Sequence, residues 1–294
     1  MTQEKPKALS PGWMVAASGL FIFFWASGFV SAKFGLPYAE PFTFLALRFL
    51  VALVVLVPLT VFWRVRWPKT PTAFIHVIVA GLLVQTTYLT GVFYGIYFGL
   101  STGVMALIVG LQPLITGSLA APLLGEKVTS KQWLGLGMGF VGLGLVVAEK
   151  VELVGQGAWA VAFAGLALIG ITIGTIYQKR FCAEVDARAA VTVQNAASFV
   201  IIGFLATQIE TMAVDWTGEF IFALIWSGVG LSVIAIALYF ILVQRGAAAQ
   251  VTSLIYLSPP TTAIMGWLMF GETFALMALI GMAIAVAGVA IVNR

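Results

Sequence analysis

Long apolar segments, separated by short polar ones, account for almost the whole chain. Most of them approach the roughly 20 residues that a helix needs to cross a hydrocarbon core about 30 Å thick. Several contain proline or many glycines, which neighbouring helices of a membrane bundle tolerate. The pattern predicts an all-α integral membrane protein with ten transmembrane helices, at about residues 12–34, 42–63, 73–95, 100–124, 132–148, 155–178, 187–208, 219–243, 247–270 and 274–292.

The second half of the chain repeats the first at a constant offset of 146 residues. Matches among alanine, valine, leucine and glycine carry little weight in so apolar a chain, whereas matches of tryptophan, lysine, proline and glutamate carry more. The repeat predicts a tail over 1–11, a first five-helix repeat over 12–148 and a second over 155–292. The rarer matches are Trp13 with Trp159, Lys33 with Lys179, Pro113 with Pro259, and Gly125-Glu126 with Gly271-Glu272.

The composition excludes a soluble globular protein and limits the chemistry. The chain is 61% hydrophobic and 9% charged, whereas soluble domains carry roughly 25% charged residues. A single cysteine, Cys182, excludes an intramolecular disulfide and a CxxC metal site. With His76 as the one histidine, a multi-histidine site is excluded as well. We therefore expect neither a metal nor a cofactor.

The placement of lysine and arginine predicts the orientation. Twelve of these residues lie in the two termini and in alternate loops, while the opposite ends hold only Lys33 and Lys150. The positive-inside rule places both termini in the cytoplasm. The basic charge therefore reflects orientation and contact with anionic lipid, not binding to nucleic acid. Because five helices is an odd number, the second repeat crosses the membrane with opposite polarity, which predicts an inverted repeat.

Several short motifs resemble those of a known family across essentially the whole chain. They are Trp25-Ala-Ser-Gly-Phe29 with Lys33, Phe44-x-x-x-Arg48-Phe49, the turns Leu111-Gln112-Pro113 and Leu257-Ser258-Pro259, and the repeated Gly-Glu pair. With these motifs the sequence is similar to the drug/metabolite transporter superfamily, specifically its EamA-type ten-helix exporters, and looks most like the YddG-type exporters of aromatic and other neutral amino acids.

The resemblance implies a secondary transporter in a bacterial-type inner membrane. It would export small neutral amino acids by alternating access, through a central cavity between helices 1, 3 and 4 and helices 6, 8 and 9. No pair of carboxylates lies in mid-membrane, which favours uncoupled or weakly coupled export, because coupled carriers commonly use intramembrane acids. The rival within the class exports another small metabolite, a drug or a nucleotide sugar and is proton-coupled, with His76 as its titratable candidate.

Two other classes of protein fit less well. A membrane-embedded enzyme would need a metal cluster, a carboxylate pair or a Ser/His/Asp set, and none can be assembled within the predicted spans. An ion channel would need a polar filter built from rings of side chains or from oriented carbonyls. The sequence leaves open whether the protein is a monomer or a homodimer, since the small-residue faces Gly135-x-x-x-Gly139 and Ala283-x-x-x-Ala287 suit either kind of contact.

The charged candidates have two interpretations each. Apart from lysine and arginine at the very ends of spans, Arg48 is the one such residue inside a predicted span, and intramembrane charge is a functional hypothesis by default. We interpret it first as a structural charge paired with Glu40 or with backbone carbonyls, and second as a substrate contact. Lys33 lies at a helix end, where it either snorkels to the interface or holds a carboxylate at the mouth of the pathway.

The polar and aromatic candidates cluster in corresponding helices of the two halves. Gln85 and Tyr88 are expected to share one helical face. Trp25, in mid-span, either forms a flat wall for a substrate ring or faces lipid. Prolines in corresponding helices predict either a binding site or a gating kink. The substrate-pathway candidates are Trp25, Lys33, Gln85, Tyr88, Tyr94, Gln112, Ser232, Tyr239, Tyr256 and Ser258, and the gating candidates are Pro113, Pro259 and Pro260.

Overall fold

The computed structural model of the protein describes residues 11–112, 115–116, 119, 130–151, 156–235, 238, 257–274 and 276–292. Regular secondary structure within these ranges is helical, apart from one isolated bridge between Ala39 and Val214. Two segments, η1 and η2, are π-helical. The elements are α1 (Pro11–Gly35), α2 (Pro41–Phe62), α3 (Pro71–Gly81), η1 (Leu82–Thr87), α4 (Tyr88–Tyr97), α5 (Thr102–Gly110), α7 (Ser130–Val151), α8 (Gln156–Phe181), α9 (Ala187–Ile209), α10 (Gly218–Ile225), η2 (Trp226–Ala235), α13 (Ser258–Phe270) and α14 (Leu276–Val292).

Helices long and apolar enough to cross a membrane dominate the described residues. There are five of them, one of which joins α3, η1 and α4 into a single run, and three shorter apolar helices accompany them. The prediction of an all-helical membrane protein is thereby confirmed for the described residues. The number of crossings and the side on which the termini lie stay predictions. The five long runs are Ala16–Gly35, Pro41–Phe62, Pro71–Tyr97, Gly157–Phe181 and Ala187–Ile209.

Proline and short polar side chains define where several helices begin. α2 and α3 begin at Pro41 and Pro71. Proline has no backbone N–H, and at the first position of a helix this costs nothing, because an N–H there has no acceptor within the helix. The side chains of Thr70, Ser101 and Thr217 each accept a hydrogen bond from the backbone N–H three residues later. Such caps satisfy donors that a helix leaves open at its N-terminus. These helix starts are therefore specified locally.

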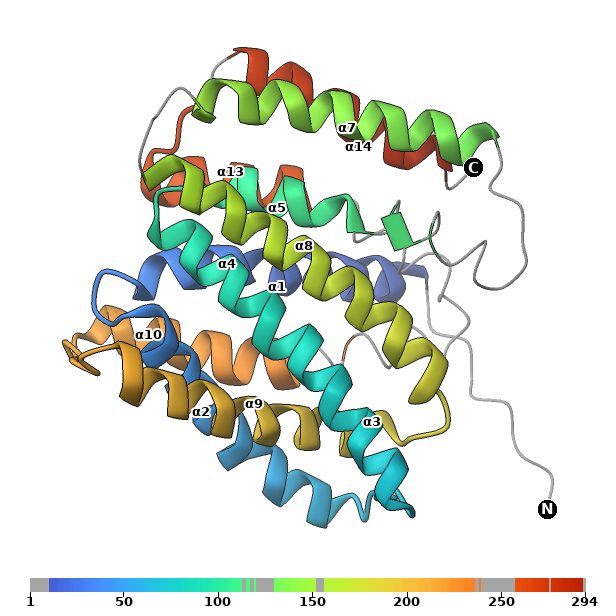
Figure 1. Cartoon of the computed structure of the whole chain (residues 1–294), viewed down its shortest axis with the longest axis vertical. Helices are drawn as coiled ribbons and strands as arrows, with labels where there is room; N and C mark the ends of the chain where they lie inside the picture. Colours follow the sequence, from blue (N-terminus) through green and yellow to red (C-terminus); the bar gives the residue numbers. More distant parts are fainter. Residues whose placement is uncertain are drawn as a thin grey trace.

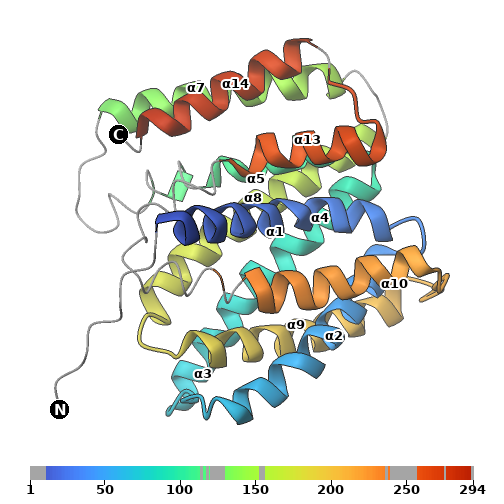
Figure 2. The same cartoon turned by 180° about the vertical axis from the view of Figure 1, so that it is seen from behind.

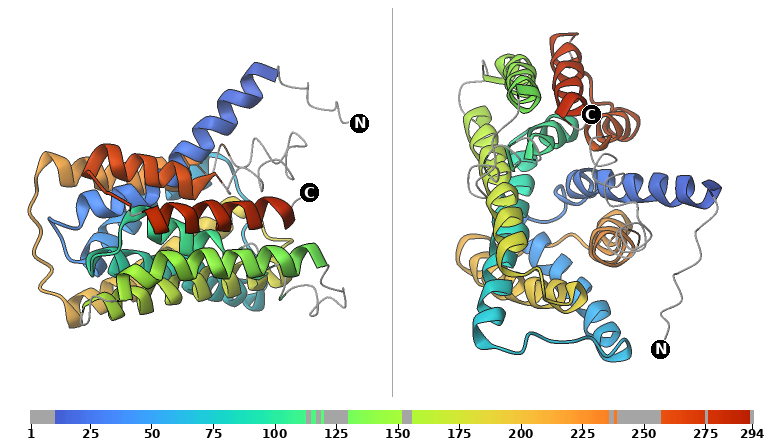
Figure 3. Two further views of the ribbon diagram at one scale, coloured as in Figure 1. Left: turned by 90° about the horizontal axis from the view of Figure 1, so that it is seen from above. Right: turned by 90° about the vertical axis from the view of Figure 1, so that its right-hand side faces the viewer.

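Helices from the two halves of the chain pack against each other throughout the bundle (Figures 1 and 2). α2 lies beside α9, α5 beside α13 and α7 beside α14, while α4 packs on α8 and α1 packs on η2. The end views show α7 and α14 as a pair at one side of the bundle (Figure 3). The Gly135 and Gly139 face of α7 is used in this pairing, because a methyl group on Gly288 of α14 would lie 2.7 Å from the carbonyl oxygen of Gly135. One small-residue face thus packs within the chain.

The aromatic core lies near the end of the bundle at which α1 ends and α2 begins, called the Gly35 end below; the opposite end is the Pro11 end. Three fully buried phenylalanines from three helices meet there. The ring centroid of Phe44 lies 5.2 Å from that of Phe93 and 5.4 Å from that of Phe220. Gly35 permits this arrangement, since the ring of Phe44 occupies the place where a side chain on residue 35 would be.

Gly91 marks a close approach between α4 and α8. An added methyl group would come within 2.5 Å of the backbone nitrogen of Ala167 and the carbonyl oxygen of Phe163, which cannot rotate away. Gly91→Ala is therefore expected to destabilise the protein by about 1–3 kcal/mol, seen as a lower thermal midpoint of the detergent-solubilised protein. The matched control is Gly165→Ala on α8, where the added methyl group meets open space. Equal midpoints for the two variants would contradict the prediction.

Candidate functional site

Arg48 is a buried cation inside α2. Only 8% of its surface is exposed, and its Nε has no hydrogen-bond partner. The expectation that Arg48 pairs with Glu40 is wrong. Glu40 Oε2 instead accepts hydrogen bonds from the backbone N–H and the hydroxyl of Thr211, both at 2.7 Å. Among the described residues, no carboxylate forms an ion pair with Arg48.

The position of Arg48 is a junction between the two halves of the chain. Tyr88, the first residue of α4, is close enough to interact with the guanidinium group electrostatically. Gly228 of η2 packs on the backbone of α2, where a methyl group on Gly228 would lie 3.2 Å from the carbonyl oxygen of Arg48 and 2.7 Å from Cγ1 of Val51. The residue thus belongs to a helix, α2, that contacts both α4 of the first half and η2 of the second.

η1 changes the geometry that the sequence predicted for Gln85 and Tyr88. The expectation that these residues share one face assumed α-helical spacing, but residues 82–87 form a π-helix. A π-helix bonds residue i to residue i+5, so its wider turn moves Gln85 and Tyr88 further apart around the axis. Both are half-buried, and neither makes a hydrogen bond with another described residue. They remain polar groups available to a ligand.

The π-helical turns occur at equivalent places in the two halves. Adding the repeat offset of 146 to residues 82–87 gives 228–233, which lies inside η2. In η1 the hydroxyl of Thr87 donates to the carbonyl oxygen of Leu82 at 2.9 Å, which satisfies an acceptor at the widened turn. Ser232 lies in η2 and is buried. π-helical turns are frequent at functional sites, and the apolar pattern carries no signal for them.

One helix ends and another begins at positions separated by the same offset of 146. α5 ends at Gly110 with a turn at Leu111, and α13 begins at Ser258 after a turn at Leu257. The two helix ends meet in space, because a methyl group on Gly110 would lie 2.9 Å from Cγ of Pro259. Within the described residues, a helix end and a helix start thus lie next to the two predicted breaks, and a proline-induced interruption of each helix stays a prediction.

The side chains near these helix ends differ in their surroundings. Gln112 Nε2 donates to the hydroxyl of Thr116 at 3.0 Å, so this amide already has a local partner. Ser258 and Pro259 are buried, while Pro260 is half-buried. Three further candidates, Pro113, Tyr239 and Tyr256, lie outside the described residues.

Two tryptophans near the middle of the bundle have different environments. Trp25 of α1 is 39% exposed, and its ring centroid lies 5.7 Å from that of Phe21. Trp226, which the sequence analysis did not identify, donates its indole N–H to the hydroxyl of Ser27 at 2.8 Å and stacks on Phe24 at 5.0 Å. Trp226 thereby joins η2 to α1. Its distance from the ends of its apolar segment was the signal that could have identified it.

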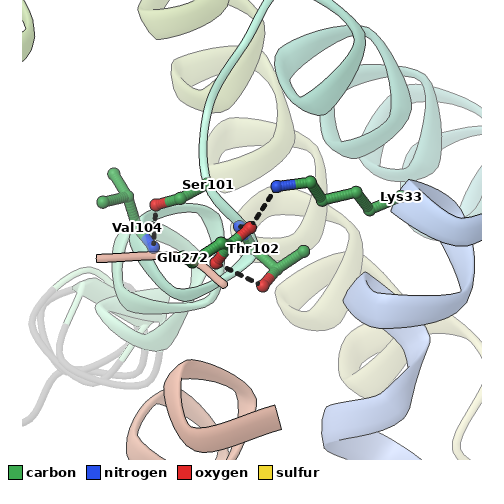
Figure 4. A network of polar contacts seen from close by, with 5 residues as sticks. All are labelled: Lys33, Ser101, Thr102, Val104 and Glu272. Atoms are coloured by element: carbon green, nitrogen blue, oxygen red, sulfur yellow. Dashed lines mark hydrogen bonds and ion pairs between the residues drawn. The ribbon is translucent and has the colours of Figure 1, made fainter. Parts of the chain in front are cut away.

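A polar network closes the Gly35 end of the bundle between α1, α5 and α13 (Figure 4). Lys33 Nζ donates to Glu272 Oε1 at 2.6 Å and lies 5.0 Å from the centroid of the Phe270 ring. The backbone N–H and the hydroxyl of Thr102 donate to the two carboxylate oxygens of Glu272 at 3.0 and 2.9 Å. Lys33 is therefore committed to a protein partner. Glu272 and Thr102 were not among the predicted site residues, although the repeated Gly-Glu pair pointed to residue 272.

The charge state of Glu272 follows from this network. Burial acts to raise the pKa of the Glu272 carboxyl group, but the Lys33 ammonium group and the two Thr102 donors outweigh it and leave the pKa below its ordinary value. The carboxylate side chain is 5% exposed and that of Lys33 is 33% exposed. Glu272 is thus ionised at neutral pH and holds three elements together.

A second network at the Gly35 end joins α2, α4 and α9. Glu210 accepts hydrogen bonds from the backbone N–H groups of Phe42 and Thr43, both at 2.7 Å, and from the hydroxyl of Tyr94 at 2.8 Å. The carboxylate therefore caps the N-terminus of α2 from the C-terminus of α9, which requires the two helices to run antiparallel. Tyr94 also stacks on Phe163, with ring centroids 5.0 Å apart. Like Lys33, Tyr94 therefore already has a hydrogen-bond partner within the protein.

His76 lies in α3 near the Pro11 end, apart from both networks. Its Nδ1 is 2.7 Å from the hydroxyl of Tyr177, and its ring stacks on Phe181 with centroids 4.6 Å apart. The histidine therefore connects α3 to the last turns of α8. No described carboxylate forms an ion pair with it.

Comparison with known proteins identifies the family. The EamA-like transporter family matches the chain twice, over residues 12–148 and 158–294. The chain belongs to this family. Relatives of this EamA-family protein include "Uncharacterized transporter YvbV" of Bacillus subtilis, which is 27% identical over 92% of this chain and 88% of the relative. "Probable amino-acid metabolite efflux pump" of Salmonella typhimurium is 25% identical over 92% of this chain and 91% of the relative.

A solved structure supports the fold of the EamA-family chain. It is described in the words "Crystal structure of protein", and its sequence is 18% identical to this one. The structural match covers 96% of this chain and 98% of the solved chain, with a TM-score of 0.67. At this identity the likeness concerns the fold alone. The family membership makes the protein a multi-pass membrane transporter and not an enzyme, as the sequence predicted.

The structure of this EamA-family transporter divides the predicted site residues into two groups. Lys33, Tyr94 and Gln112 have hydrogen-bond partners within the protein. Arg48, with Tyr88 nearby, has no such partner among the described residues. The unpaired group, at the junction of the halves, is the candidate substrate site.

Proposed function

We propose that this transporter exports small neutral amino acids, aromatic ones included, by alternating access between two inverted five-helix repeats. The observation that carries the proposal is that α5 ends, and α13 begins, at positions related by the repeat offset, and that these helix ends meet at Gly110 and Pro259. Interrupted helices in corresponding halves mark the substrate site of many secondary transporters. The substrate would occupy a central cavity between helices 1, 3 and 4 and helices 6, 8 and 9 of the ten.

The helix pairings support an inverted repeat. Under the offset of 146, α2 corresponds to α9 and α7 to α14, and each of these pairs is in contact. The contact of η1 with α8 corresponds in the same way to that of η2 with α1. The antiparallel course of α2 and α9 fits halves of opposite polarity, and the two family matches are themselves 146 residues apart. Such symmetry lets small rearrangements exchange the two faces of a carrier.

The substrate class rests on a relative and on charge. The Salmonella typhimurium relative is named an amino-acid metabolite efflux pump. The described carboxylates Glu40, Glu210 and Glu272 lie at helix ends, next to spans and not within them. Since coupled carriers commonly place acids inside the membrane, export would be uncoupled or weakly coupled. The protein would work as a monomer or a homodimer, without a cofactor.

A relative supports the assignment to an inner membrane, and the charged loops support the orientation of the chain in it. "Uncharacterized inner membrane transporter YedA" of Escherichia coli is 24% identical over 92% of this chain and 87% of its own. We place the protein in a bacterial-type inner membrane with both termini in the cytoplasm, because lysine and arginine gather at that side of the predicted spans.

Counterflow in proteoliposomes tests the proposal. Vesicles loaded with unlabelled phenylalanine, threonine or methionine would receive the labelled amino acid outside, with and without an imposed pH gradient. Labelled uptake that ignores the gradient is the expected result. Uptake that follows the gradient would favour the proton-coupled alternative with His76 as the candidate proton site, whose Nδ1 lies 2.7 Å from the hydroxyl of Tyr177. No uptake of any amino acid would contradict the substrate class.

Tyr88→Ala is expected to raise the half-saturation concentration for phenylalanine counterflow by about three- to tenfold, as for the loss of one hydrogen bond to a ligand. Gln85→Ala is expected to act in the same direction. The control is Tyr97→Ala, because Tyr97 lies on the same helix α4 and is an exposed tyrosine. Wild-type values for both Tyr88→Ala and Gln85→Ala would remove this part of the bundle from the pathway.

A further inference from the structure

Arg48 is a cation for which the described protein supplies no counter-charge. Its Nε is fully covered and has no hydrogen-bond partner. The carboxylate expected to neutralise it, Glu40, is bound to Thr211. A charged side chain inside a membrane protein is costly and normally faces a partner or a pathway. The missing partner therefore has to be explained.

The second half of the chain shows that the fold itself does not require a cation here. Under the offset of 146, Arg48 corresponds to Gln194 of α9. Gln194 is buried and neutral, and its Nε2 donates to Oε1 of Gln178 at 3.4 Å. Gly81 packs directly on it, since a methyl group on Gly81 would lie 2.8 Å from the Cα of Gln194. At the equivalent place, then, a neutral amide with a protein partner is sufficient.

We propose that Arg48 binds the carboxylate group of the transported molecule. The inference rests on the proposed function and extends it, because it specifies which chemical group the cargo must carry. A guanidinium group presents planar donors that match a carboxylate, and such charge-assisted hydrogen bonds are about twice as strong as neutral ones. The nearby Tyr88 hydroxyl adds a neutral donor on α4. Arg48 thus selects carboxylates and rejects cationic amines that lack one.

The location of Arg48 suits a transport site better than a fixed structural charge. Its helix, α2, packs on α4 of the first half and on η2 of the second, and Gly228 of η2 approaches the backbone of Arg48. A cargo carboxylate at this point would contact helices from both halves, whose relative movement alternating access requires. The π-helical segments η1 and η2 include positions of the two halves that the repeat offset relates.

The first experiment measures competition with labelled phenylalanine in counterflow by the wild-type protein. Unlabelled phenylalanine is expected to compete, whereas phenylalanine methyl ester, which keeps the ammonium group and the ring but lacks the carboxylate, is expected to compete at least about tenfold less well. Equal competition by the ester would overturn the proposal. This measurement needs no variant, so it does not depend on the folding of a mutant.

The second experiment uses two variants. Arg48→Gln introduces the residue type that the equivalent position already carries, so the variant is expected to elute as the wild type does on size exclusion. It is expected to raise the half-saturation concentration for phenylalanine by about tenfold or more. Arg48→Lys keeps the charge but loses the planar donors, and is expected to lie between Arg48→Gln and the wild type. Wild-type half-saturation in Arg48→Gln would overturn the proposal.

A third measurement separates this inference from the proposed function. If the wild type moves no amino acid, its thermal midpoint is measured with phenylpyruvate or succinate and with phenethylamine. Stabilisation by a carboxylate in the wild type, absent in Arg48→Gln, would retain the Arg48 site and discard amino acids as the cargo. If neither carboxylate stabilises the wild type, both the site and the cargo are rejected.

Discussion

Glu272→Ala is expected to lower the free energy of unfolding by about 2–3 kcal/mol. The substitution leaves the Lys33 ammonium group and the backbone N–H of Thr102 without their acceptor. Removing one partner of a buried ion pair usually has a larger effect, but Lys33 is one-third exposed and can turn to water. The loss should appear as a lower thermal midpoint in detergent. The matched control is Glu219→Ala. This variant also removes a carboxylate from the Gly35 end, but the hydrogen bond that Glu219 accepts from Tyr38 is exposed to solvent. Equal losses would contradict a special role for Glu272.

The same residue is expected to make stability depend on pH. Because the pKa of Glu272 is lower in the folded protein than its ordinary value of 4.5, its contribution is complete above about pH 4.5 and is lost as the pH falls through the folded-state pKa. The difference in thermal midpoint between the wild type and Glu272→Gln should therefore shrink below that pH. A difference that stayed constant would contradict an ionised Glu272.

Replacing both Pro259 and Pro260 by alanine is expected to reduce the rate of transport by about tenfold or more, while the protein still folds. Proline supplies no backbone N–H, so the helix cannot continue through these residues in the N-terminal direction. Alanines restore two donors and allow α13 to extend through the turn at Leu257. The helix break that faces Gly110 would then be lost. Initial rates of counterflow measure the effect.

The control for this double substitution lies in another span. Pro58 is a proline inside α2, and it is exposed on the surface of the bundle. Pro58→Ala also restores a helical donor, but far from the meeting point of α5 and α13. It is expected to leave the rate within about twofold, since an exposed substitution seldom changes more. A loss of rate in the control equal to that in the double variant would show that helix stiffness in general, and not this interruption, limits transport.

Much of the fold could be predicted from the chain because membrane spans are specified locally. Apolar length locates the helices, while residues such as Pro41, Pro71 and Thr70 fix where they begin. The constant repeat offset also relates the turn at Leu111, after α5, to the turn at Leu257, before α13. The number of crossings and the inverted arrangement remain predictions.

The site was harder to predict because its partners are remote in the sequence. Glu40 looked like the natural partner of Arg48, eight residues away on the same helix, yet its carboxylate is bound to Thr211. Likewise Lys33 finds Glu272 across 239 residues, a pairing that no local pattern indicates. Side-chain hydrogen bonds between distant helices depend on packing, so sequence spacing alone selects the residue types but not the partners.

The π-helical turns η1 and η2 have a consequence for the rotational phase of the helices that contain them. A π turn acts as a one-residue insertion into an α-helix, and one residue corresponds to about 100° of rotation. Deleting one residue from η1 would restore the α-helix and turn α4 by that angle. Tyr94 would then point away from Glu210. The second half carries a longer π-helical segment that includes the equivalent residues, so a deletion in η1 alone would change the rotational phase of one half and leave that of the other unchanged.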